Sequence, residues 1–334
     1  VVLLVWLFRK YEVKDKLLAI RPADLVLAGA MILLACAVNT LRWQLLLRNV
    51  GIVRNWGGLF VLYLIGLFFT SFLPTGTGGD AVRIFDVARR SGKTAGAIVA
   101  TLQERFFGMG TSMLIGLVAT LFYWARLPEN VRWWILLALA AGPAGVLVLL
   151  YPGPWVRAAR DWLGISYQSK GIVGRVMRLL KPMLELPSLA PGRLLAVASV
   201  TAAGVVVSIG VYPVIGRSLN FPVAPGGWLL VIPLVWVIKM VPITLGGAGV
   251  GELAVVGLLS QIFQAPTGNA TAIAFAFLAL QYCVAMFGGL LLAIKMLTGT
   301  WVPVREEAIE AAEMPVKTIE EAEARAARAE ATAP

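Results

Sequence analysis

The amino-acid sequence predicts an all-α polytopic membrane protein with about six to eight transmembrane helices and two re-entrant, or broken, helical hairpins in an inverted repeat. Two observations support this fold class. Of the 334 residues, 59% are hydrophobic and only 14% are charged, which lies outside the range of soluble globular domains. In addition, two short hydrophobic segments, 57–73 and 226–241, each lead into a proline and then a glycine pair. Interrupted segments of this kind in corresponding halves are typical of inverted repeats.

Five stretches are long and apolar enough to cross the bilayer. A helix needs about 20 apolar residues to span about 30 Å of hydrocarbon, and this length is reached in 24–47, 96–123, 131–151, 193–216 and 270–297. We expect residues 1–8, which are also apolar, to be the last turns of a further helix, and no signal peptide is recognisable. Segment 57–73 is short for a span, so it either crosses the membrane or enters and leaves on one side.

The distribution of positive charge predicts the orientation. The net charge of +11 favours anionic lipid surfaces and cytoplasmic loops over nucleic acid. The longest polar connector, 152–193, is basic and carries apolar residues at helical spacing, which predicts amphipathic helices on the headgroup layer. We expect it, residues 83–93 and the acidic tail 299–334 to be cytoplasmic, in the inner membrane of a prokaryote. The basic residues at 9–21 oppose a re-entrant 57–73, because they would then lie outside.

The residue types present exclude several classes of enzyme. The chain contains no histidine, which removes serine–histidine hydrolases and HExxH zinc sites. The two cysteines, Cys36 and Cys283, lie in apolar stretches, so we expect packing residues and neither a disulfide framework nor a metal cluster. No catalytic residue, cofactor or metal ligand is predicted.

The two glycine motifs share one spacing. In LPTGTGGD (73–80) and VPITLGGAGVGE (241–252), a proline precedes a glycine pair by four and five residues, and an acidic residue follows. They fall in a first repeat at about 24–123 and a second at about 193–297, within a membrane domain 1–298. The positions are Pro74, Gly78, Gly79 and Asp80 in the first motif, and Pro242, Gly246, Gly247 and Glu252 in the second, where Gly249 is a further hinge.

This pattern predicts an anion site. Irregular backbone at membrane depth is tolerated only where protein or a water-filled cavity satisfies its amides. A helix that opens after glycines presents free N–H groups and a positive dipole end. Arg83 lies one turn into the first such helix and is suited to bidentate binding of phosphate, while Asp80 at i−3 can pair with it in the empty site. The alternative is that the glycine pairs only let helices pack closely.

Other charged residues lie at membrane depth. Glu104 and Arg105 are about 15 Å into their predicted span at about 1.5 Å per residue. Charges there are costly and functional, or alternatively form an internal pair that locks two helices. Arg42 is a further candidate, unless its side chain snorkels to the interface. Lys239, one turn before Pro242, is placed for the second hairpin.

Four stretches resemble a known family. LRWQLLLRNVGI (41–52), SFLPTGTGGDAVR (71–83), LQERFFG (102–108) and VPITLGGAGVGE (241–252) are similar, in order and separation, to the lysylphosphatidylglycerol synthase membrane-domain family, also called flippase-like integral membrane proteins. The resemblance extends to about residue 298. In two-part synthases it implies a domain that flips an aminoacylated phospholipid made by a separate soluble domain. Here we expect a stand-alone member without the synthase domain, whose cargo need not be that lipid. The matching positions are Arg42, Pro74, Gly78, Gly79, Asp80, Arg83, Glu104, Arg105, Pro242, Gly246, Gly247, Gly249 and Glu252.

We therefore expect a lipid translocator for an anionic or phosphate-containing lipid or lipid-linked precursor. Two alternatives remain open: a membrane enzyme on a lipid-linked sugar or phosphate with Asp80 or Glu252 as base, and a scaffold for a partner lipid synthase. The expected partners are anionic membrane lipids and a separate lipid-synthesising enzyme. The expected binding residues are Arg42, Gly78, Gly79, Asp80, Arg83, Glu104, Arg105, Lys239, Gly246, Gly247 and Glu252.

Overall fold

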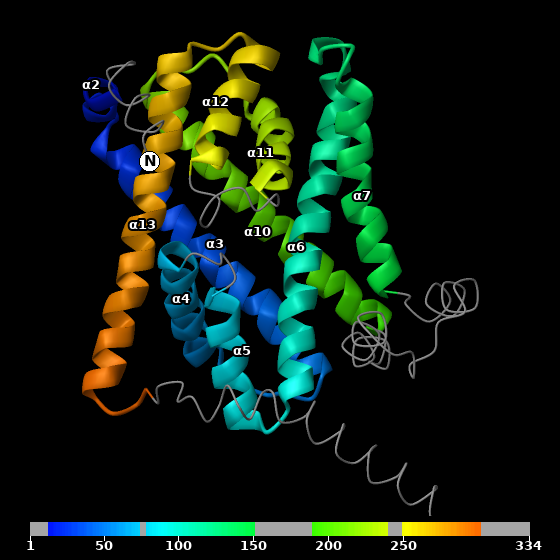
Figure 1. Cartoon of the computed structure of the whole chain (residues 1–334), viewed down its shortest axis with the longest axis vertical. Helices are drawn as coiled ribbons and strands as arrows, with labels where there is room; N and C mark the ends of the chain where they lie inside the picture. The colour runs from blue at the N-terminus through cyan, green and yellow to red at the C-terminus, as the bar shows by residue number, and fades with distance from the viewer. Residues whose placement is uncertain (1–12, 74–77, 151–188, 240–248, 302–334) are drawn as a thin grey trace, which may run out of the picture. The chain divides into compact units, whose positions relative to one another are not determined.

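The structure is a computed structural model that describes residues 13–73, 78–150, 189–239 and 249–301. Within these ranges every element is helical, so the predicted all-α class is confirmed. The main helices are α2 (Val13–Leu18), α3 (Pro22–Asn49), α4 (Trp56–Phe72), α5 (Gly78–Ser91), α6 (Thr94–Phe122), α7 (Arg132–Leu150), α10 (Pro191–Ser218), α11 (Pro225–Lys239), α12 (Val250–Phe263) and α13 (Thr267–Leu297) (Figure 1).

Four of the described helices, α3, α6, α10 and α13, are long and apolar enough to cross a membrane. They correspond to four of the five predicted spans. The fifth, 131–151, corresponds to α7, which falls among the shorter apolar helices together with α4, α11 and α12. The chain is thus a polytopic membrane protein in which several apolar helices are too short to span alone.

Contacts at the helix ends establish the direction of the chain. Lys93 Nζ donates a hydrogen bond to the Gly51 carbonyl over 2.9 Å, and Arg193 Nη1 donates to Asn49 Oδ1 over 3.2 Å. The end of α3 therefore lies beside the starts of both α6 and α10. We call this the Asn49 end.

A second group of contacts defines the opposite end. Arg217 Nε donates to Asp24 Oδ1 over 2.7 Å, which joins the end of α10 to the start of α3. Asn269 Nδ2 donates to the Leu219 carbonyl over 3.2 Å, which brings in the start of α13. We call this the Asp24 end. Since α3 and α10 link the two ends in opposite directions, they pack as antiparallel neighbours.

The α4–α5 pair begins and ends at the Asn49 end. Gln44 Nε2, in the last turns of α3, donates to the Arg54 carbonyl over 2.8 Å just before α4, and α5 ends at Ser91, beside the Lys93 contact. The two helices pack against each other, and the end of α4 and the start of α5 lie between the two ends of the bundle (Figure 1). Segment 57–73 therefore forms one arm of a helical hairpin that begins and ends at the same end of the bundle, which favours a re-entrant segment over a crossing one.

The α11–α12 pair begins and ends at the Asp24 end. Tyr123 directly follows α6, and its hydroxyl would lie 2.9 Å from a Cβ on Gly226 in the first turn of α11. The Tyr123 ring also packs edge-on against the ring of Phe263 at the end of α12, with 5.3 Å between the ring centroids. The series α3, α4–α5, α6 thus runs opposite to the series α10, α11–α12, α13 (Figure 1). This is the arrangement that an inverted repeat requires.

The chain divides into two compact units, Val1–Leu291 and Leu292–Pro334, and the features below lie in the first. Its largest buried side chains include Trp43 and Trp228. Cys36 is buried as expected, whereas Cys283 is exposed and does not pack. The predicted helix at 1–8, nearly all of the amphipathic connector 152–193 and the tail beyond 301 lie outside the described residues. The predicted domain boundaries stay predictions.

Candidate functional site

Three arginines and two acids from α3, α5 and α6 form one ion-pair network. Glu104 accepts from Arg42 Nη2 over 2.5 Å and from Arg83 Nη2 over 2.9 Å. Arg83 Nη2 also donates to Asp80 Oδ1 over 2.6 Å, so the predicted pairing of these two residues is present. The other oxygen of Asp80 pairs with Arg105 Nε. One connected chain of charges therefore links five of the predicted site residues.

Two of these residues differ from their simplest sequence interpretations. Arg42 is only 5% exposed and does not snorkel to the interface, because the Glu104 carboxylate holds it inside. Glu104 does not form a pair that locks two helices. It joins three, since its partners lie on α3 and α5.

Aromatic rings fix the Arg83 guanidinium. Its Cζ lies 4.7 Å from the centroid of Trp43 and 4.6 Å from that of Tyr63, within the range of cation–π attraction. Trp43 is itself held by a hydrogen bond of 3.1 Å from its Nε1 to Thr101 Oγ1. The planar group is thus preorganised before any ligand arrives.

Two guanidinium nitrogens beside a cavity lack partners. Arg42 Nε and Arg83 Nη1 are buried and make no hydrogen bond within the described parts of the chain. Both side chains line a cavity of about 350 Å³, together with Asp80, Glu104 and Arg105. A buried donor without an acceptor costs about 1–3 kcal/mol, so these two arginines have hydrogen-bonding capacity that the described residues leave unused.

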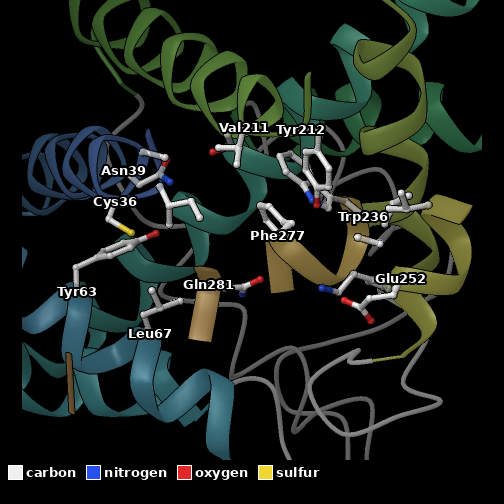
Figure 2. A pocket seen from close by; sticks show the side chains of 18 residues that line it. Cys36, Asn39, Tyr63, Leu67, Val211, Tyr212, Trp236, Glu252, Phe277 and Gln281 are labelled. Atoms are coloured by element: carbon white, nitrogen blue, oxygen red, sulfur yellow. The ribbon is translucent and has the colours of Figure 1, made fainter. Parts of the chain in front are cut away.

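A second cavity of about 250 Å³ adjoins the first. It is lined by Lys239 and Glu252 from the second hairpin, and by the aromatic side chains Tyr212 and Phe277 (Figure 2). The two cavities share the residues Asn39, Tyr63, Leu67, Ser208 and Trp236. Figure 2 shows Asn39, Tyr63 and Leu67 on one side of the second cavity and Trp236 with Glu252 on the other. The charged network lines the first cavity and the second hairpin lines the second, and we call the five residues common to both cavities the shared wall.

The second glycine motif shapes the start of α12. Gly249 has φ +92°, in the region that only glycine adopts readily. Its N–H donates to the Glu252 carboxylate over 2.5 Å, so this acid caps its own helix. A Cβ on Gly251 would lie 2.7 Å from Lys239 Cδ. The absence of that Cβ lets the lysine side chain lie against the first turn of α12.

The first glycine pair opens a helix and also permits close packing. The sequence predicts a helix that opens after the glycine pair, whereas α5 begins at Gly78 and includes both glycines in its first turn. A Cβ on Gly79 would lie 2.0 Å from the Gly66 carbonyl oxygen, so α4 and α5 are in backbone contact. The packing alternative therefore applies to Gly79. It does not explain Asp80 and Arg83 in the following turn, which face the cavity.

Four predicted positions, Pro74, Pro242, Gly246 and Gly247, lie outside the described residues. The meeting of the two glycine pairs stays a prediction. Sequence reasoning missed Trp43 and Tyr63 at the arginine, and Asn39, Ser208 and Trp236 in the shared wall. Asn39 and Ser208 were recognisable as isolated polar residues within long apolar spans.

The sequence of the chain matches the family described as Lysylphosphatidylglycerol synthase TM region over residues 1–289. The protein belongs to this family. The resemblance seen in the four motifs is thereby confirmed, and the chain carries a membrane domain associated with lipid handling. No curated protein matches it. Each of the three acids at these positions has a partner in this chain. Asp80 and Glu104 pair with arginines, and Glu252 accepts a hydrogen bond from the Gly249 backbone amide.

Proposed function

We propose that the protein translocates an anionic or phosphate-containing lipid, or a lipid-linked precursor, across the cytoplasmic membrane. The observation that carries the proposal is the pair of buried guanidinium nitrogens, Arg42 Nε and Arg83 Nη1, left without partners on side chains that line a cavity. Phosphate oxygens are the acceptors that a guanidinium binds best.

The charge of the network supports this choice. Three arginines face two carboxylates, which leaves one positive charge in excess. Four of the five side chains are at most 17% exposed, and an excess charge among largely buried groups is stabilised by a counter-ion. A phosphate headgroup supplies both the charge and the missing hydrogen-bond acceptors.

The two cavities suggest the route. The first is lined from the α4–α5 hairpin, which enters at the Asn49 end, and the second from the α11–α12 hairpin, which enters at the Asp24 end. In the proposed transport, the headgroup passes the shared wall while the acyl tails stay in the bilayer. Burying only the headgroup avoids moving a charge through hydrocarbon.

We assign the Asn49 end to the cytoplasm of a prokaryotic cell. Its described basic residues are Arg48, Arg54, Arg89, Arg90, Lys93 and Arg193. The Asp24 end carries as many described basic residues, namely Lys14, Lys16, Arg21, Arg126, Arg132 and Arg217. The assignment therefore rests on the basic connector 152–193, because the start of α10 that follows it lies at the Asn49 end. We also propose a cytoplasmic C-terminus, as expected from the sequence. We further propose that the basic connector 152–193 binds a separate lipid-synthesising enzyme.

We favour transport over an enzyme acting on lipid-linked sugars or phosphates. A general base needs a free lone pair directed at the substrate. Asp80 holds two arginines and Glu252 caps α12, so both proposed bases have structural partners in this state.

Replacement of Arg83 tests the proposal. In proteoliposomes with a fluorescent anionic phospholipid, Arg83→Ala should slow headgroup transfer by roughly tenfold to a hundredfold, the equivalent of about 1.5–3 kcal/mol for a charged hydrogen bond. Arg83→Lys should recover part of the rate, because lysine keeps the positive charge but lacks the two parallel N–H donors of a guanidinium group. Arg89→Ala is the matched control, since Arg89 is exposed on the same helix. Undiminished transfer by a folded Arg83→Ala protein would contradict the proposal.

A further inference from the structure

The two acids of the network have different surroundings. The side chain of Glu104 is 4% exposed and lies between Arg42 and Arg83. The side chain of Asp80 is 17% exposed and lies between Arg83 and Arg105, whose own side chain is 40% exposed. Glu104 is therefore a buried structural counter-ion, whereas Asp80 stands at the more open side of the cavity.

Asp80 also occupies the position that suits a bound phosphate. One carboxylate oxygen accepts from Arg83 and the other pairs with Arg105, so the two guanidinium groups converge on it. A phosphate with two free oxygens would make the same pair of contacts. The carboxylate thus contributes a negative charge where the headgroup charge would also lie.

The charges around the site can be counted from its described lining. The first cavity has three arginines and two acids, and the second adds Lys239 and Glu252, which cancel. Residues 74–77 and 240–248, which lie outside the described ranges, contain no charged residue in the sequence. One phosphodiester, with a single negative charge, therefore neutralises the site. A phosphomonoester carries about 1.5 to 2 negative charges and would leave an excess.

We propose that Asp80 is an internal counter-ion that limits the headgroup site to one negative charge, and so selects phosphodiester over phosphomonoester lipids. This inference rests on the proposed function and adds a specificity-determining residue to it. Removing the Asp80 charge makes the site more positive by one unit. The preference then shifts toward headgroups with two negative charges.

Asp80→Asn is the direct test, because the amide keeps the shape and removes the charge. Binding of phosphatidylglycerol and of phosphatidic acid is measured on the full chain in detergent micelles at about pH 8, where a phosphomonoester is close to doubly ionised. The wild type should favour phosphatidylglycerol. Asp80→Asn should raise the affinity for phosphatidic acid relative to phosphatidylglycerol by roughly tenfold.

Asp86→Asn is the matched control. Asp86 lies on the same helix and also pairs with two arginines, Arg54 over 3.5 Å and Arg90 over 3.0 Å, but it lines neither cavity. Its replacement should leave the ratio of the two affinities unchanged. An equal shift of the ratio in both variants would overturn the inference, since it would reflect general surface charge.

The outcomes separate this inference from the proposed function. If Asp80 only supports the fold, Asp80→Asn weakens both lipids alike and the ratio stays constant, which overturns the inference alone. If the wild type binds neither lipid, both the inference and the proposed function fail. The unfolding midpoint of each variant in detergent shows whether loss of binding reflects loss of structure.

Discussion

At the scale of single residues, Glu104 is the centre of the site. It is 3% exposed and holds Arg42 and Arg83, which come from two other helices. Without it, two buried guanidinium groups would have no carboxylate between them. Removing one member of a buried ion pair is far more costly than never having built the pair.

We therefore expect Glu104→Gln to lower the free energy of unfolding by about 3–5 kcal/mol. Chemical denaturation of the purified protein in detergent measures this value. Glu129→Gln is the comparison, because Glu129 is 87% exposed and meets Arg132 at 3.4 Å, and it should cause no measurable change. A Glu104→Gln protein as stable as the wild type would show that the arginines find other partners.

The residue contacts explain why the sequence identified the participants but, apart from the Asp80–Arg83 pair, not their partners. Glu104 and Arg105 are adjacent, and neighbours in a helix point in different directions. Glu104 pairs with Arg83, which is 21 residues away, and with Arg42, which is 62 residues away. Arg105 pairs with Asp80. Charge at membrane depth is visible in a sequence. The partner is decided by which helices meet, which depends on the whole fold.

At the scale of elements, α4 is held by backbone contacts on two sides. A Cβ on Gly79 of α5 would lie 2.0 Å from the Gly66 carbonyl oxygen. A Cβ on Gly288 of α13 would lie 2.0 Å from the Leu64 carbonyl oxygen. Small residues at such contacts let membrane helices pack closely. The first hairpin is therefore positioned by shape as well as by charge.

Gly79→Ala should separate α4 from α5 and lower the unfolding free energy by roughly 1–3 kcal/mol, the usual cost of overpacking. It should also displace Asp80 and slow transport. Gly58→Ala is the control in α4, since nothing lies within 4 Å of its added Cβ. That change should be neutral or stabilise the protein by about 0.5–1 kcal/mol. Equal stability of the two variants would mean that the helices shift freely.

The hairpins themselves were predictable, because a proline and a glycine pair interrupt each short apolar segment at the same spacing. The capping role of Glu252 was not predictable from the sequence. An acid near a helix start is typical of both an anion site and a cap, and only the 2.5 Å contact with the Gly249 amide distinguishes them.

At the scale of the whole chain, the topology makes a direct prediction for labelling. In a background without Cys36 and Cys283, cysteines at Val53 and Arg89 flank the α4–α5 hairpin, and both positions are exposed. A membrane-impermeant thiol reagent should reach both from the same side. It should reach a cysteine at Glu129 or Asn220 only from the other side. Labelling of the first two positions from opposite sides would mean that α4 crosses the membrane.

The shortness of the hairpin helices has a consequence for biogenesis. The helices α4 and α11 have 17 and 15 residues, less than the roughly 20 that stable insertion in lipid requires. We expect such segments to insert less readily on their own than the long helices beside them. Each hairpin is then expected to enter the bilayer after its flanking long helices, so that the candidate site is completed last.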